Sequence, residues 1–136
     1  MITFGSLFAG IGGLDLGLER AGMECKWQVE IDEFCRKVLA KHWPNVRRHD
    51  DIRTWPCVFD HYAAPEQIDV DLICGGFPCK QTSTSAAMHE GRNGLDGKDS
   101  FLWWEMLRVV EEIKPKMVIV ENVAGAKTWS SEIAGG

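Results

Sequence analysis

The sequence predicts an α/β fold in which a doubly wound, mostly parallel sheet carries helices on both faces. Short apolar runs alternate along the chain with segments whose apolar residues recur at helical spacing, and this alternation is typical of βαβ units. Glycine turns or acidic residues follow several of the runs, where parallel sheets bind ligands. At 136 residues we expect a single domain that spans residues 1–136.

The first predicted unit is a strand, a glycine turn and a helix. Residues 3–8 form an apolar run that ends at the glycines. Leu14, Leu18 and Ala21 then recur at i, i+4 and i+7, which predicts the inward face of a short helix that closes at Gly22.

The second unit begins with a predicted strand over residues 26–31. Asp32 is suited to cap the helix that follows, and Pro44 stops it. We expect a short third strand at residues 46–50, and the proline-containing stretch 54–67 is predicted to be mainly loop.

The last predicted unit contains a long polar loop. Residues 69–74 are expected to form a strand that is buried on both faces. The small, polar stretch 80–99 is long for a loop in a compact domain, and such loops are usually functional. A helix capped by Ser100 and a fifth strand at residues 117–120 complete the expected elements.

Composition limits the classes of protein that fit. The net charge of −5 and pI near 5.3 argue against an autonomous nucleic-acid binder, which usually presents a basic face. No apolar run approaches the roughly 20 residues of a membrane span, and the N-terminus has no export signal. The five cysteines fit neither a disulfide framework nor a zinc site, so we expect reduced thiols in a cytoplasmic protein without a bound metal.

The first glycine turn, Phe8-Ala9-Gly10-Ile11-Gly12-Gly13, is suited to cradle a nucleoside cofactor. It departs from the dinucleotide fingerprint because Asp15 stands where that pattern needs its third glycine. Glu30 ends the second strand, where an acid can bind ribose hydroxyls, and Asp51-Ile52 follow the third strand. This combination favours S-adenosylmethionine; the alternative is a turn that merely packs a helix on a strand.

A second glycine turn presents a cysteine that is suited to nucleophilic chemistry. Cys79 follows Gly76-Phe77-Pro78, and Pro78 restricts the backbone that carries the thiol. Glu121 ends the last apolar run, where desolvation favours a neutral carboxyl that can donate a proton. Taken separately, Cys79 also fits a packed small residue, and Glu121 also fits a solvated strand end.

With these residues the chain resembles the DNA (cytosine-5-)-methyltransferases. Three segments match the family in order and spacing: Phe8-Ala9-Gly10-Ile11-Gly12-Gly13 its first motif, Gly76-Phe77-Pro78-Cys79 its nucleophile motif, and Glu121-Asn122-Val123 its Glu-Asn-Val motif. The match covers essentially the whole chain. It implies a Rossmann-like fold of the S-adenosylmethionine-dependent methyltransferase type.

The resemblance also implies a reaction and roles for residues. Cytosine would be flipped from the DNA duplex, Cys79 would attack its carbon 6, and Glu121 would hydrogen-bond ring nitrogen 3. A methyl group would then pass from S-adenosylmethionine to carbon 5. By the same matching, residues 80–99 correspond to the catalytic loop, and the cofactor would contact Phe8, Ala9, Gly10, Ile11, Gly12, Gly13, Glu30, Ile31, Asp51, Ile52, Pro78 and Leu102.

The chain also departs from the family pattern. Lys80 stands where the family commonly has glutamine, and Asp99 stands at the place of an arginine. Because the chain stops soon after Glu121, we expect an N-terminal catalytic portion whose sheet is incomplete at its C-terminal end. Its target-recognition domain would then lie elsewhere, and a second polypeptide could carry it. The exposed sheet edge would favour pairing or poor solubility.

Two alternatives to an active portion remain. One is an inactive cofactor-binding remnant or a subunit of a split enzyme. The other is a nucleotide-dependent oxidoreductase with Cys79 as a redox thiol, which the glycine spacing and the absence of a C-x-x-C pair disfavour. The resemblance does not distinguish a restriction-linked from a solitary role, nor does it give the DNA sequence recognised.

Overall fold

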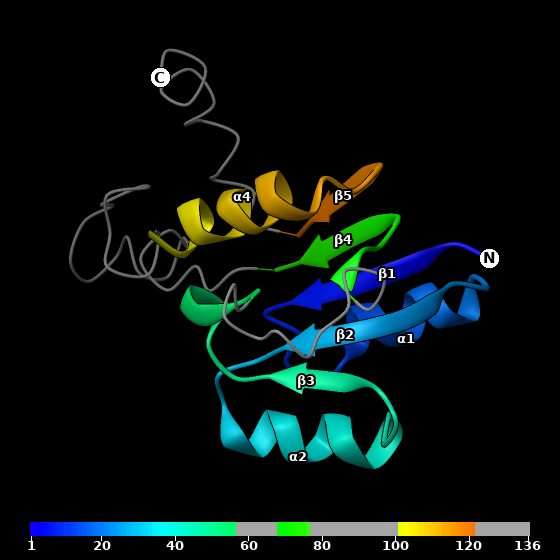
Figure 1. Cartoon of the computed structure of the whole chain (residues 1–136). Helices are drawn as coiled ribbons and strands as arrows, with labels where there is room; N and C mark the ends of the chain where they lie inside the picture. Colours follow the sequence, from blue (N-terminus) through cyan, green and yellow to red (C-terminus); the bar gives the residue numbers. More distant parts are fainter. Residues whose placement is uncertain (57–67, 77–100, 122–136) are drawn as a thin grey trace, which may run out of the picture.

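The computed structural model of the chain describes residues 1–56, 68–76 and 101–121. Within these residues it forms a five-stranded parallel sheet with the order β3-β2-β1-β4-β5 (Figure 1). The elements, in chain order, are β1 (Thr3–Leu7), α1 (Gly13–Arg20), β2 (Glu24–Val29), α2 (Glu33–His42), β3 (Arg47–His49), the 3₁₀ turn η1 (Ile52–Thr54), β4 (Leu72–Gly75), α4 (Phe101–Ile113) and β5 (Met117–Val120).

The strand order confirms the predicted doubly wound sheet. From β1 the chain moves outward to β2 and β3, then returns to the other side of β1 to form β4 and β5. The order therefore reverses between β1 and β4, and ligands bind at such reversals beyond the carboxyl ends of the strands. The turn that starts at Phe8 and the turn that starts at Gly76 both leave the sheet at this point.

Two cores fill the two faces of the sheet. On the face that carries α4, the buried side chains include Leu7, Trp27, Ile73 and Met106. Gly5 makes this packing possible, because a Cβ on Gly5 would lie 2.1 Å from the indole ring of Trp27. The other core surrounds α1 and consists of the buried residues Phe4, Leu18, Cys25, Leu72 and Cys74.

The inward face predicted for the first helix was wrong. Leu18 is buried, but Leu14 and Ala21 are exposed, and Asp15 takes the inward position with no exposed surface. Helix α1 starts at Gly13 after Gly12 in a left-handed conformation, and this start turns Asp15 onto the sheet. There the carboxylate accepts hydrogen bonds from polar side chains of β1 and β2, so a polar contact replaces the expected apolar one.

Other predicted boundaries hold with small shifts. Asp32 caps α2, since its carboxylate accepts a hydrogen bond of 3.0 Å from the Cys35 amide. Strand β4 begins at Leu72 rather than residue 69 because Asp71 instead binds the start of β1. Its carboxylate accepts a 3.0 Å bond from the Thr3 amide, and Lys116 donates to it at 2.9 Å. The predicted catalytic loop, 80–99, and the Ser100 cap lie outside the described residues.

Strand β5 lies at one end of the sheet in the part of the chain that the structure describes. There it pairs only with β4. Three of its apolar side chains are exposed, namely Met117, Val118 and Val120. This strand is therefore suited to contact further polypeptide.

Candidate active site at the carboxyl ends of β1 and β4

Two neighbouring cavities occupy the point where the strand order reverses. The first, of about 270 Å³, is lined by Ser6, Leu7, Phe8, Ala9, Leu14, Asp15, Gly75, Gly76 and Glu121. The second, of about 300 Å³, is lined by Phe8, Val29, Glu30, Ile31, Asp50, Asp51, Ile52, Arg53, Gly76 and Leu102. Because Phe8 and Gly76 line both, the two cavities form one bipartite site, hereafter the switch-point cleft. Small-molecule sites usually measure roughly 300–1,000 Å³.

Phe8 stands between the two halves of this cleft in an uncommon backbone conformation. Its φ is +51°, a left-handed value that is rare for a bulky side chain and that concentrates at functional sites. Gly10 also has a positive φ, of +59°. The tight turn at these residues places Phe8 and Ala9, the start of the glycine motif, at the cleft.

Glu30 connects the glycine turn to the end of β2. Its Oε1 accepts a 2.9 Å hydrogen bond from the Gly10 amide, and its Oε2 accepts a 3.1 Å bond from the Asp32 amide. Each carboxylate oxygen can accept a further bond, so Glu30 retains capacity for the hydroxyls of a ligand. Ile31, the next residue, lines the same half of the cleft.

Asp51 and Ile52 lie opposite Glu30 in the second half of the cleft. Ile52 is buried and offers an apolar wall. Asp51 is held by Arg53, whose Nε and Nη2 donate to its carboxylate at 3.0 and 2.7 Å. These hydrogen bonds keep the pKa of Asp51 below its ordinary value. A ligand amine at this position would donate to the same carboxylate that Arg53 contacts.

The remaining glycine-motif residues lie away from the cleft. Ile11, Gly12 and Gly13 line a separate cavity between α1 and α2, beside Trp43. Gly12 has a φ of +91°, and a Cβ there would lie 2.4 Å from the indole of Trp43. A glycine is therefore needed at position 12 because Trp43, at the end of α2, packs against it. Of the other motif residues, Ala9 lines the first half of the cleft.

Glu121 lies where the two turns meet. Its amide donates a 3.0 Å hydrogen bond to the Gly75 carbonyl, which extends the pairing of β4 and β5 by one residue. Its side chain lies against Gly76, so that a Cβ on Gly76 would be 2.6 Å from Oε2. The carboxyl group is thus fixed beside the first residues of the segment that leads to Cys79.

Cys79 and Pro78 lie outside the described residues, so their predicted roles stay predictions. The three described cysteines are unreactive thiols. Burial raises the pKa of Cys74 to about 12 and raises that of Cys25 further, while a hydrogen bond to Asp32 raises the pKa of Cys35 to about 11. None of these three is a thiolate at neutral pH, which a nucleophile requires.

Asp15 is a site residue that sequence reasoning missed. Its Oδ1 accepts a 2.6 Å bond from the Ser6 hydroxyl, and its Oδ2 accepts a 2.8 Å bond from the Gln28 amide. Burial raises the pKa of its carboxyl group. The sequence held one signal for it: Asp15 directly follows Leu14 of the expected apolar face, and the two flanking strands contain the polar residues Ser6 and Gln28.

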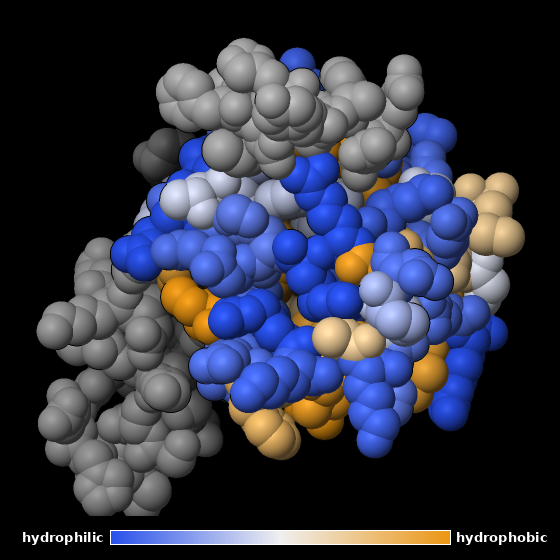
Figure 2. Space-filling view, turned by 60° about the horizontal axis from the view of Figure 1, so that its bottom comes forward, coloured by the Kyte–Doolittle hydropathy of each residue, from blue (hydrophilic) through white to orange (hydrophobic). Residues whose placement is uncertain are grey.

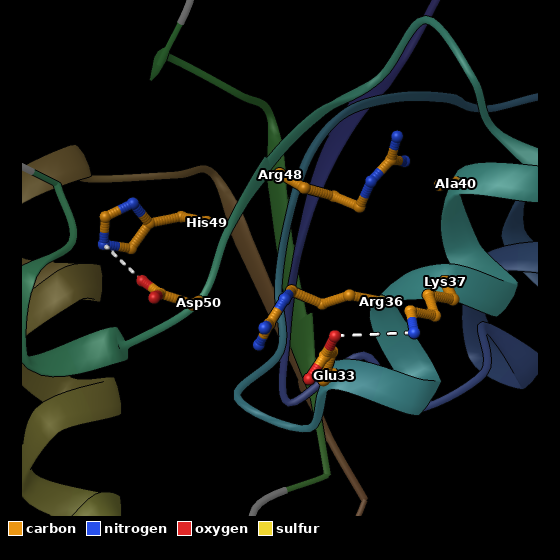
Figure 3. Close-up of a pocket in the computed structure, with 7 residues that line it drawn as sticks. All are labelled: Glu33, Arg36, Lys37, Ala40, Arg48, His49 and Asp50. Atoms are coloured by element: carbon orange, nitrogen blue, oxygen red, sulfur yellow. Dashed lines mark ion pairs between the residues drawn. The ribbon is translucent and has the colours of Figure 1, made fainter.

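A wider, open cavity of about 520 Å³ lies between α2 and β3 (Figure 3). Figure 2 shows a mostly hydrophilic surface on the α2 side of the molecule. The cationic groups of this cavity are already engaged: Arg36 donates to the Ile31 carbonyl, Arg48 to the Trp43 carbonyl, and Lys37 pairs with Glu33. Arg48 also donates to the Gln28 side chain at 3.2 Å, so it helps to hold β3 against β2.

The described residues contain no group of three or more His, Cys, Asp and Glu residues placed to hold a metal ion. No helix among them is both long and apolar enough to cross a membrane.

Residues 2–132 match the family model described as C-5 cytosine-specific DNA methylase. Among curated proteins, the chain is 35% identical over 127 residues to the Type II methyltransferase M.AquIA of Picosynechococcus sp., covering 92% of this chain and 50% of that protein. It is 32% identical to M.HhaI of Haemophilus parahaemolyticus, covering 90% of this chain and 34% of that protein.

Solved structures agree with this match. A crystal structure of an Escherichia coli prophage-encoded protein assigned as a DNA modification methyltransferase superposes with a TM-score of 0.74 at 28% identity, covering 99% of this chain and 36% of that one. A DNMT2 mutant from Spodoptera frugiperda has a TM-score of 0.62 at 18% identity, covering 98% of this chain and 39% of that one, and it shows the shared fold alone.

The chain belongs to the C-5 cytosine-specific DNA methylase family. This family uses S-adenosylmethionine as its methyl donor. The chain spans half or less of the length of the relatives described above.

Proposed function

We propose that this chain is the cofactor-binding and catalytic portion of a DNA cytosine-5 methyltransferase, which transfers a methyl group from S-adenosylmethionine to carbon 5 of cytosine. The observation that supports it most is the position of Glu121. Its side chain lies against Gly76 at the switch-point cleft, and Cys79 follows Gly76 by three residues. A cytosine ring held by both residues would sit at the mouth of the cofactor site.

The described residues fit S-adenosylmethionine. The half of the cleft with Glu30, Ile52 and Leu102 offers a carboxylate for ribose hydroxyls and apolar side chains for adenine. Asp51 would accept a hydrogen bond from the adenine amine, and Phe8 would lie against the ring. The half with Ala9 would then take the methionine part, close to Glu121. When bound, this cofactor supplies an electrophilic methyl group.

The roles of the protein residues follow from the chemistry of cytosine. The Cys79 thiolate would form a bond to carbon 6, which pushes electron density onto carbon 5. Glu121 would hydrogen-bond ring nitrogen 3 and the exocyclic amine. Carbon 5 would then be nucleophilic enough to accept a methyl group. Loss of the carbon-5 proton to solvent would restore the ring double bond, break the bond from sulfur to carbon 6 and release the product.

The partners of the chain are part of this proposal. DNA with a flipped cytosine is the substrate, and the reaction would take place in the cytoplasm with the DNA. The acidic net charge of −5 is unfavourable for DNA binding without help. We therefore propose that a second polypeptide, or further sequence, supplies the contacts that recognise the target DNA.

The test is transfer of a labelled methyl group from S-adenosylmethionine to DNA, by the chain alone and with complementing polypeptide. We expect Cys79→Ser and Glu121→Gln to abolish or greatly reduce transfer. Cys35→Ser is the matched control and should leave it unchanged. Cofactor binding without transfer in every combination would instead favour an inactive remnant, and binding of a nicotinamide cofactor in place of S-adenosylmethionine would favour the oxidoreductase.

A further inference from the structure

The switch-point cleft contains a buried carboxyl group that the proposed reaction does not use. Asp15 has no exposed surface, so it lies directly behind the wall of the half of the cleft that contains Glu121. The hydrogen bonds to its two oxygens come from neutral groups, the Ser6 hydroxyl and the Gln28 amide. None of the described residues that line this half is cationic.

The buried carboxyl group of Asp15 is unusual because no cationic side chain among the described residues contacts it directly. Buried carboxylates are ordinarily paired with a cation because burial of an unpaired charge is costly. Arg48 reaches Asp15 only through Gln28, whose Oε1 it contacts at 3.2 Å. A cationic ligand in the cleft would therefore supply the charge that the surrounding side chains do not.

Building on the proposed function, we infer that Asp15 makes the cleft selective for the charged methyl donor over its demethylated product. The donor carries a positively charged sulfonium, whereas the product, S-adenosylhomocysteine, has an uncharged thioether at that atom. The two molecules share the adenosine and the amino-acid end. Both molecules carry an ammonium group at the amino-acid end, but only the donor adds a sulfonium charge. A negative group behind the methionine half of the cleft therefore stabilises the donor more than the product.

The groups around Asp15 shape its protonation. Burial raises its pKa most, the hydrogen bonds from Ser6 and Gln28 lower it, and Glu19 on the same helix raises it slightly. Burial also raises the pKa of Cys25 on β2 and of Cys74 on β4, and the nearby carboxylate of Asp15 adds to that shift. Glu121 is the other acid that lines this half of the cleft.

A consequence is that donor binding is linked to a proton. A cation near Asp15 favours its ionised form. At pH values where part of the Asp15 population is protonated, binding of S-adenosylmethionine releases protons, and its affinity therefore rises with pH. Binding of S-adenosylhomocysteine has a much weaker linkage.

The experiment is calorimetric titration of the chain with each of the two molecules, in buffers of different ionisation enthalpy and at several pH values. For the wild type we expect proton release with the donor only. Asp15→Asn should weaken donor binding by roughly three- to tenfold and leave product binding nearly unchanged. Glu111→Gln, which removes an exposed acid on α4, is the control for charge loss and should change neither affinity.

Ser6→Ala separates charge from geometry, because it removes one hydrogen bond and keeps the carboxyl group. It should retain the donor preference at neutral pH. The inference is overturned if Asp15→Asn weakens both ligands equally, or if the wild type releases no proton with the donor at any pH tested. If Asp15→Asn does not fold, the wild-type proton measurement still decides. If neither molecule binds the wild type, the cofactor proposal itself fails, and this inference fails with it.

Discussion

Gly76 leaves no room for a side chain beside Glu121. A Cβ at this position would lie 2.6 Å from Glu121 Oε2, well inside van der Waals contact. Gly76→Ala should therefore displace the carboxyl group from the cleft and lower methyl transfer at least about tenfold, since small misplacements of a catalytic group are costly. Labelled-methyl transfer to DNA measures this.

The matched control is Gly17→Ala on α1, where a Cβ would meet nothing within 4 Å. It should retain nearly full activity. If Gly76→Ala kept full activity while Glu121→Gln lost it, the carboxyl group would be needed but its placement by Gly76 would not. That result would contradict the prediction.

At the residue scale, the sequence predicted site residues most successfully where they directly follow a strand. Glu30 and Glu121 follow apolar runs, so a parallel sheet brings both to one edge. Asp15 was not predicted as part of the site because burial of an acid depends on partners in other strands, here Ser6 and Gln28. Ser6 and Gln28 lie 9 and 13 residues from Asp15 on two different strands, and only the folded sheet places both beside its carboxylate.

At the element scale, β1 and β2 depend on one glycine. In Gly5→Ala the new methyl group would overlap the indole of Trp27, to which the nearest atom lies 2.1 Å from the Cβ position. Trp27 is fully buried and cannot move aside freely. We expect a loss of roughly 1–3 kcal/mol in the free energy of unfolding, or more, measured by urea denaturation.

Gly17→Ala is the contrasting substitution. Gly17 lies within α1, where a Cβ would meet nothing within 4 Å. It should stabilise the chain by roughly 0.5–1 kcal/mol, because alanine favours helix more than glycine does. Equal effects of the two substitutions would contradict the packing described for β1 and β2.

The strands and helices could largely be predicted because apolar runs, Asp32 and the prolines define them locally. The inward face of α1 could not, because a helix of eight residues offers few turns over which to read a period. The start of β4 also shifted, because Asp71 binds Thr3 and Lys116 rather than continuing the strand. Both differences arise from polar side-chain contacts between different elements, which the apolar pattern of one element does not reveal.

At the scale of the whole molecule, β5 presents an apolar surface. Met117 is 57% exposed, and in the described part of the chain β5 pairs on one side only. We expect the chain alone to self-associate as its concentration rises, because exposed strands and apolar patches favour contact. Sedimentation velocity at several concentrations measures this.

Met117→Lys should shift the chain towards monomer. Ile2→Lys, which changes a comparably exposed side chain (51%) outside the sheet, should not. A wild type that stays monomeric at high concentration and melts cooperatively would argue against a contact surface at β5.

The most direct measurement of the central claim is covalent trapping with DNA that contains 5-fluorocytosine, in the presence of S-adenosylmethionine and complementing polypeptide. Fluorine at carbon 5 cannot leave as a proton does, so the bond between sulfur and carbon 6 persists. We predict a stable protein–DNA adduct that Cys79→Ser abolishes and Cys35→Ser preserves. An adduct that survives Cys79→Ser, or methyl transfer to ordinary DNA with no adduct to the fluorinated DNA, would contradict the account.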